Sequence, residues 1–359
     1  MISNSKCLWA FAALLLISSL ASAQVVTVSP VPGNNTASGT NLLNALAGIV
    51  DASAAKPYVL RLEPGTYDIG STALAMKPYV DIEGSGQQST IIRGIGNNTG
   101  WLTAVVLGAS PAELRNLQVQ SLGRTYAYSI AVLLNQVNTS IRDVTLTSSY
   151  ATSTWGLRNL GSSPIVQNVT IAVTGGTATY GIANTGATIP STPLIRRAVI
   201  NVSGAVSGYG IYSDQNASPR IRDVEIAVNS KGGYGIAYSY FGYLTGATLE
   251  VTNARINVVG SSSATGIDLS GDDSVVVTHT NISAVADTAG SGIKNSSQSS
   301  SGVIVVDHCD VLGSTNSISA PFWAVRVGAS KLDGPANIGV PACVASFSGS
   351  YVPLSASCL

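Results

Sequence analysis

The sequence predicts a single all-β solenoid, in which successive coils of the chain stack on one another. Three observations lead to this prediction. The chain has a repeat of 25 to 31 residues, it has short β-branched alternations without helical periodicity, and most repeats carry Asn or Asp at the same place. In such a solenoid, parallel strands of successive coils lie about 4.8 Å apart.

The first repeated motif is an aromatic or small residue, then Gly, then Ile or Leu. A weaker first copy has Ser in place of Gly. The middle residues of successive copies are 27, 25, 29, 25, 31 and 26 residues apart. Aromatic and β-branched residues in such short runs favour strands. The copies are Tyr128-Ser129-Ile130, Trp155-Gly156-Leu157, Tyr180-Gly181-Ile182, Tyr209-Gly210-Ile211, Tyr234-Gly235-Ile236, Thr265-Gly266-Ile267 and Ser291-Gly292-Ile293.

The second repeated motif has apolar residues at its first, fourth and sixth positions, as in residues 141–146 (IRDVTL). These three side chains share one side only if the chain bends at the third position. Asn and Asp tolerate the left-handed backbone of such a bend, and we expect their side chains to hydrogen-bond along the solenoid axis. Both histidines fill this position, so we expect a structural role for them. The third-position residues are Asn116, Asp143, Asn168, Arg197, Asp223, Asn253, His279 and His308.

These repeats, with their ladder of Asn residues at a tight turn, resemble the pectate-lyase-like superfamily. Residues 58–69 (YVLRLEPGTYDI) resemble its first coil, and residues 80–86 and 90–94 continue the likeness. The resemblance covers about residues 30–325 and implies a single-stranded right-handed parallel β-helix of about nine or ten coils. A short N-terminal capping helix is expected over residues 38–51, whose apolar side chains have helical spacing.

The two ends of the chain differ from the repeats. Residues 1–23 read as a signal peptide, because Lys6 precedes an apolar run and Ala21-Ser22-Ala23 forms a cleavage site. The alternative, a membrane anchor, is disfavoured because the run is too short to span a bilayer. We therefore expect export, to the periplasm, the cell surface or the medium, with no membrane span after cleavage. Residues 24–325 are assigned to the β-helix.

Residues 326–359 are expected to form a C-terminal capping tail. The repeat pattern is lost from Phe322, and an open last coil would expose a strand edge, so Phe322 and Trp323 are expected to close it. Cys343 and Cys358 fall in this tail, and a disulfide between them is the preferred interpretation for an exported chain. Cys309 lies inside a repeat and is expected to be a buried free thiol.

Composition excludes several classes of function. Only 10% of the 359 residues are charged, and 18 basic residues balance 18 acidic ones. The chain therefore lacks the basic face that a nucleic-acid-binding protein needs. Two His and four Cys argue against a structural zinc site. Low charge also fits stacking, because like charges repeated on successive coils would repel one another.

Catalytic candidates come from the resemblance. Its lyases and hydrolases cleave acidic polysaccharides with clustered carboxylates, and its lyases also use Ca²⁺. The best local match is Asp268, Asp272 and Asp273, which could instead belong to an ordinary Gly/Asp-rich loop. Other catalytic motifs of the superfamily, an Asp in the preceding coil, a Gly-flanked His and an Arg-Ile-Lys segment, are absent from the sequence. No cofactor is expected unless the protein is a lyase, and metal ligands cannot be assigned.

Tyrosines and arginines supply the binding candidates. Tyr180, Tyr209 and Tyr234 recur at one place in the repeat, with Tyr212 close by. Such a row either binds the apolar faces of sugar rings or simply supports the stack as an aromatic ladder, which is the commoner case. A row of arginines suggests either a basic stripe for acidic sugars or ion pairs with outward carboxylates such as Asp143, Asp223 and Glu225, which the zero net charge favours. These arginines are Arg115, Arg142, Arg196 and Arg222.

Two functions follow. The preferred prediction is an exported, non-catalytic module that binds polysaccharide, a cell-surface glycan or another surface through one face of the solenoid. The alternative is a divergent polysaccharide lyase or glycoside hydrolase that acts on a pectin-like acidic polysaccharide.

Overall fold

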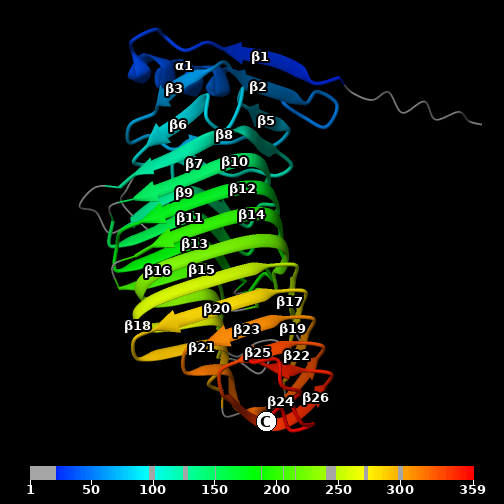
Figure 1. Cartoon of the computed structure of the whole chain (residues 1–359). Coiled ribbons are helices and arrows are strands. Elements are labelled where there is room, and N and C mark those ends of the chain that lie inside the picture. Colours follow the sequence, from blue (N-terminus) through cyan, green and yellow to red (C-terminus); the bar gives the residue numbers. More distant parts are fainter. Residues whose placement is uncertain are drawn as a thin grey trace, which may run out of the picture.

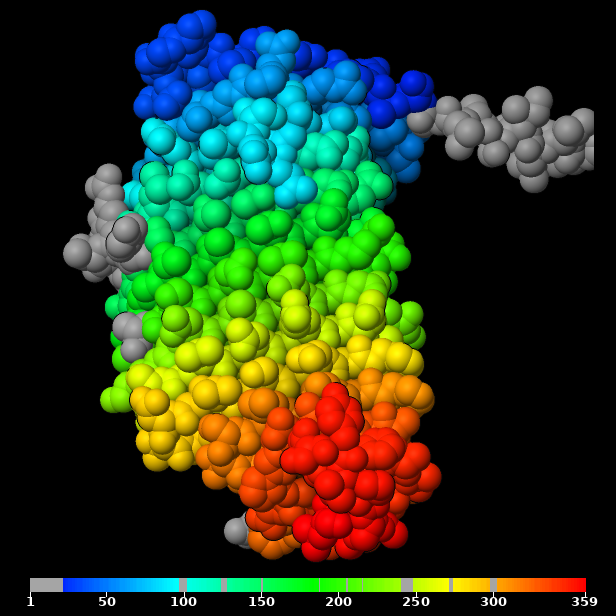
Figure 2. All heavy atoms as spheres, in the orientation of Figure 1, coloured from blue at the N-terminus to red at the C-terminus, as the bar shows by residue number. Residues whose placement is uncertain are grey.

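The computed structural model is a parallel β-solenoid of about nine turns, as the repeats predict, with one helix among the residues that it describes (Figure 1). It describes residues 22–96, 102–123, 128–149, 151–186, 188–204, 206–214, 216–239, 248–270, 274–297 and 302–359. Residues 1–21 of the predicted signal peptide lie outside these ranges. All paired strands run parallel, and each coil pairs with the coils before and after it. In Figure 2 the sequence colours accordingly follow one another in bands along the molecule.

The strands form three stacks. The first stack contains β1 (Gln24–Val28), β2 (Tyr58–Leu62), β5 (Val80–Glu83), β17 (Thr248–Thr252), β19 (Ser274–Thr278) and β22 (Val303–Asp307). The second contains β3 (Gly65–Asp68), β6 (Thr90–Gly94), β20 (Asn281–Ala286), β23 (Asp310–Gly313), β25 (Lys331–Asp333) and β27 (Phe347–Ser348). The third contains β4 (Leu74–Ala75), β7 (Val106–Leu107), β9 (Tyr128–Asn135), β11 (Ser153–Leu160), β13 (Ala178–Thr185), β15 (Ser207–Asp214) and β21 (Ala289–Asn295).

Longer strands turn a corner and join two or three stacks. They are β8 (Glu113–Leu122), β10 (Ser140–Ser149), β12 (Ile165–Thr174), β14 (Leu194–Ser203), β16 (Arg220–Ser239), β18 (Arg255–Leu269), β24 (Asn316–Gly328) and β26 (Ala336–Val344). The bend in β8, β10, β12, β14 and β16 is the third position of the second motif. Around it, the first, fourth and sixth residues point into one continuous core, as Ile141, Val144 and Leu146 do in β10. The predicted inward set is therefore confirmed.

The bend residues confirm the predicted ladder. All eight third-position residues, from Asn116 to His308, have φ between 51° and 56°. Asn168 donates to the Asp143 carboxylate, and Asn253 Nδ2 donates to Asp223 Oδ1 at 2.5 Å, so the side chains link neighbouring coils. The rings of His279 and His308 stack with centroids 5.1 Å apart. Both histidines thus hold structural positions.

Glycine in the first motif marks a close approach of two coils. The chain at Gly210 passes so near the next coil that an added Cβ would come within 2.5 Å of the carbonyl oxygen of Gly235. The same side would also collide with the inward methyl group of Ile226. Gly210 does not have a left-handed φ. The motif therefore requires Gly because no space is left for a side chain.

Helix α1 (Asn35–Gly48) covers the N-terminal end of the solenoid (Figure 1). The predicted helix over residues 38–51 was therefore right in kind and displaced by three residues at both ends. Asn34 sets the start, because its side chain accepts a hydrogen bond from the backbone N–H of Ala37 at 3.0 Å. Leu42 and Leu46 are buried, whereas Val50, which lies beyond the end of the helix, is 86% exposed.

The C-terminal end contains the predicted disulfide between Cys343 and Cys358, and Trp323 is fully buried in the core. Parallel pairing continues past Val325, because β25 and β27 extend the second stack and β26 pairs with β24. The left-handed bend also continues, at Ala329 and Ala345. Alanine at the bend position carries no Asn-like signature, which is why the sequence pattern is lost here.

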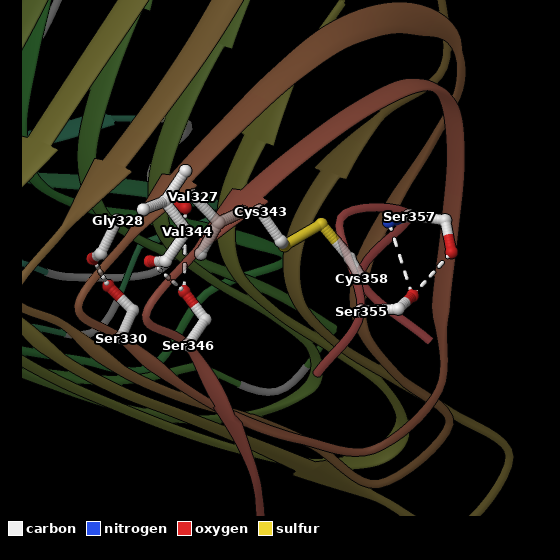
Figure 3. The surroundings of a disulfide bond; sticks show 9 residues. All are labelled: Val327, Gly328, Ser330, Cys343, Val344, Ser346, Ser355, Ser357 and Cys358. Carbon is white, nitrogen blue, oxygen red and sulfur yellow. Dashed lines mark hydrogen bonds between the residues drawn. A yellow bond between two sulfur atoms is a disulfide. The ribbon is translucent and has the colours of Figure 1, made fainter. Parts of the chain in front are cut away.

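Cys309 is a buried free thiol, as predicted, and it has a structural place. It occupies the fourth position of the second motif, where Thr280, Ser330 and Ser346 stand in neighbouring coils. Each of these side chains donates to the carbonyl two residues earlier; Ser330 does so to Gly328 at 2.6 Å and Ser346 to Val344 at 3.1 Å (Figure 3). In the final coils, the fourth position of the motif therefore holds a side chain that hydrogen-bonds to the backbone in place of an apolar one.

Three of the four arginines of the outward row form ion pairs among the described residues, whereas Arg196 forms none, and of the three expected carboxylates only Asp143 takes part. Arg115 pairs with Asp81, Glu83 and Glu113 at 2.5–3.1 Å, and Arg142 pairs with Glu113 and Asp143. Arg222 pairs with Glu250 of the next coil. In the described ranges, no helix has the length and hydropathy needed to cross a membrane.

Candidate functional site

An aromatic ladder stands on the outer face of the third stack. It consists of Trp155, Tyr180, Tyr209 and Tyr234, which occupy the same register position in β11, β13, β15 and β16. Their rings are parallel within 6–8°, with centroids 5.3, 4.9 and 4.9 Å apart. The predicted alignment of the tyrosines is therefore correct, because the repeat places one ring above the next.

Stacking decides which parts of the rings a ligand can reach. The faces of Tyr180 and Tyr209 are covered by the neighbouring rings, so a ligand meets their edges and hydroxyl groups. Tyr212 packs edge-on against both, at 5.6 and 5.4 Å. Tyr234 is the last ring, since the next residue in this register position is Thr265. The ladder thus supports the fold and also presents a row of amphipathic edges.

Buried polar side chains support the strands behind the ladder. Asn159 donates to Asn184 Oδ1 at 3.3 Å, and Asn184 donates to the Ser213 hydroxyl at 3.2 Å. These residues are fully buried. Hydrogen bonds of this kind fix the spacing of the coils and therefore the spacing of the rings.

Burial keeps the tyrosine hydroxyls protonated. It raises the pKa of Tyr180 to about 12, and it also raises the pKa values of Tyr209, Tyr212 and Tyr234. The charge of Asp268 adds to the increase at Tyr209 and Tyr234. The ladder therefore offers neutral hydroxyl groups, which both donate and accept hydrogen bonds.

Arg158 and Asp214 flank the ladder, Arg158 in β11 with Trp155 and Asp214 in β15 with Tyr209. The Arg158 guanidinium lies over the Trp155 ring, 4.9 Å from its centroid. Burial raises the pKa of the Asp214 carboxyl group, and the side chains of Thr185 and Tyr212 and the charge of Arg158 oppose that increase. Both charged residues line a cavity of about 450 Å³, together with Leu160, Thr185 and other residues of the third stack.

A second pair of opposite charges lies in the two coils that follow Tyr234. Asp268 in β18 and Lys294 in β21 are neighbours in the parallel register. Burial raises the pKa of the Asp268 carboxyl group, and the positive charge of Lys294 opposes that increase. A carboxyl group whose pKa is raised in this way has one property of a general acid.

Other parts of the predicted catalytic cluster lie outside the described residues. These are Asp272 and Asp273, so the structure places only Asp268 of the three. In the part of the chain that is described, no three Asp, Glu, His or Cys side chains gather as metal ligands.

Sequence reasoning missed Arg158, Asp214 and Lys294. A positional signal exists: Arg158, Tyr212, Asp268 and Lys294 each lie three residues after the first residue of the first motif. Strand pairing aligns them in one column. Because their chemistry differs from coil to coil, they do not read as a repeat.

No family model matches the chain, and no curated protein matches it. Among solved structures, the Dettilon tailspike protein is similar at 14% identity and a TM-score of 0.54, covering 93% of this chain and 67% of that one. ORF18 of Geobacillus virus E2 is similar at 11% identity and a TM-score of 0.50. The alignment covers 85% of this chain and spans only 60% of that one. At these identities the likeness establishes the β-solenoid fold.

A glycoside hydrolase is also found among the similar chains. The catalytic domain of a GH87 α-1,3-glucanase, solved with nigerose, aligns at 11% identity and a TM-score of 0.46, covering 90% of this chain and 67% of that one.

Proposed function

We propose that this protein is an exported, non-catalytic module that binds polysaccharide or a cell-surface glycan through the face carrying the aromatic ladder. One observation carries the proposal: aromatic edges with neutral hydroxyls lie on the same face as two pairs of opposite charge, Arg158 with Asp214 beside the ladder and Asp268 with Lys294 in the coils that follow it. Sugars have apolar C–H faces and many hydroxyl groups, so this mixture of surfaces complements them. The Cys343–Cys358 disulfide supports export, because such bonds persist in oxidising compartments.

Retention on glycans tests the proposal. Residues 24–359 should bind at least one member of a glycan array or of a panel that includes pectin, polygalacturonate and alginate. The Tyr234→Ala variant removes the terminal ring and should weaken that binding about tenfold, which corresponds to about 1.4 kcal/mol. Affinity electrophoresis or calorimetry measures the change.

Phe322→Ala provides the matched control. Phe322 is an aromatic residue outside the ladder and is 50% exposed, so its loss should leave glycan affinity unchanged. Equal losses in both variants, or failure of every glycan to retain the wild-type protein, would contradict glycan binding by the ladder face.

Catalysis at Asp268 is the second candidate function, favoured by the raised pKa of that carboxyl group. In this alternative Asp268 is the general acid of a hydrolase, or contributes to a Ca²⁺ site of a lyase. Asp272 and Asp273 would supply further carboxylates. The wild-type protein and the Asp268→Asn variant should be incubated with pectin, polygalacturonate and alginate, with and without Ca²⁺. Under the main proposal neither releases reducing or unsaturated ends, and release by the wild type alone would establish the alternative.

A further inference from the structure

The cavity beside Trp155 has a mixed electrostatic character. Arg158 and Asp214 are the only charged residues among the described residues that line it, so its formal charge is zero. Its volume of about 450 Å³ lies within the range of small-molecule sites. Apolar lining comes from Leu160 and Ile189, and polar lining includes Thr185.

Asp214 has unused hydrogen-bonding capacity. Its Oδ1 atom is buried, and no described residue donates a hydrogen bond to it. Buried carboxylate oxygens are nearly always paired with donors, so this atom is suited to receive a donor from a ligand. The neighbouring Arg158 supplies only donors, because a guanidinium has no acceptor.

A sugar hydroxyl matches this pair, because it donates through its hydrogen and accepts through its oxygen. Neighbouring hydroxyls of one ring could therefore satisfy Asp214 and Arg158 together. A uronate carboxylate fits less well, since it would be placed near the Asp214 carboxylate in a partly dry site. Asp268 and Lys294 are a second pair of opposite charges on the same face, so the charges there also cancel.

We infer that the Arg158–Asp214 cavity is a subsite for a pyranose unit of a neutral glycan, and that it selects against polyuronates. This inference rests on the proposed glycan-binding function and gives it a ligand class. It differs from the acidic polysaccharide that the sequence resemblance implies. Asp214 accepts from one ring hydroxyl, Arg158 donates to another, and Leu160 and Ile189 contact the apolar part of the ring.

The experiment compares neutral and acidic oligosaccharides. Residues 24–359 are titrated calorimetrically with gluco-, manno- and galacto-oligosaccharides and with oligogalacturonate. The wild type should bind a neutral oligosaccharide at least tenfold more tightly than oligogalacturonate. Asp214→Asn should weaken neutral binding about tenfold and strengthen oligogalacturonate binding, because it removes the negative charge that repels a uronate. Asp287→Asn, at an exposed carboxylate on a distant coil, should change neither affinity.

Thermal unfolding would reveal whether Asp214→Asn is misfolded. In that case a second variant tests the same inference. Ile189 lines the cavity and is 41% exposed, so Ile189→Trp should fold and obstruct the cavity without altering either charge. It should abolish neutral binding. If neutral glycans bind but neither variant changes their affinity, the cavity inference fails while the binding function stands. Preference of the wild type for oligogalacturonate would also overturn the inference, and absence of binding to any glycan would overturn both proposals.

Discussion

Replacing Gly210 by alanine is expected to lower the free energy of unfolding by about 3 kcal/mol, near the upper end for overpacking of a core. The added methyl group would meet the carbonyl oxygen of Gly235 at 2.5 Å and the Ile226 side chain. A side chain can rotate away, but the carbonyl belongs to a parallel strand held on both sides. The variant must therefore push two coils apart.

Gly48→Ala is the matched control, because an added Cβ at Gly48 would have no atom within 4 Å. Gly48 ends helix α1, where alanine is the better helix former, so this variant should be neutral or slightly stabilising. Urea unfolding followed by circular dichroism measures both variants. Equal midpoints for Gly210→Ala and Gly48→Ala would show that the coils are not held at the spacing described here.

Loss of the disulfide should have an effect of similar size. Cys343 and Cys358 are separated by 15 residues, and a loop of that length contributes about 3 kcal/mol when closed by a disulfide. The double variant Cys343→Ser/Cys358→Ser should lower the unfolding midpoint accordingly. It should also increase proteolysis near the C-terminus, because the disulfide covalently joins the segment after β27 to β26.

Cys309→Ser is the control for this experiment. A serine hydroxyl can donate to the Asp307 carbonyl as the thiol does, and Ser330 and Ser346 already make this hydrogen bond in later coils. We expect a change of about 0.5 kcal/mol or less, as for a conservative substitution. A reducing agent should destabilise the Cys309→Ser protein and leave the double variant unchanged. Equal sensitivity of the two variants to the reductant would contradict the assignment.

Much of the fold could be predicted because its constraints recur in every coil. The bend demands a left-handed residue at each turn, so Asn116, Asp143 and Asn168 reveal one another by their spacing. Prediction failed where the bend or the end of an element is formed by a residue without a repeated signature. Alanine at 329 and 345 makes the same bend without a recognisable side chain, and the limits of helix α1 depend on a single cap at Asn34.

The candidate site was harder to predict for the same reason. Tyr180, Tyr209 and Tyr234 repeat, so their alignment was visible in the sequence. Arg158 and Asp214 are not repeated at the equivalent positions of other coils. They lie in different coils and are 56 residues apart in the sequence. Only the parallel register, which aligns Leu160 with Thr185 and Thr185 with Asp214, brings them to one cavity.

The solenoid has a modular consequence for how this binding face can change. Each coil contacts only the coils beside it, so a whole coil can be copied or deleted while the others keep their neighbours. Copying the coil that carries Tyr209 would lengthen the aromatic ladder by one ring without a new fold. Under the proposed function, the length of polymer that the protein contacts therefore depends on the number of coils, which tandem duplication of a short stretch of gene can alter in one step.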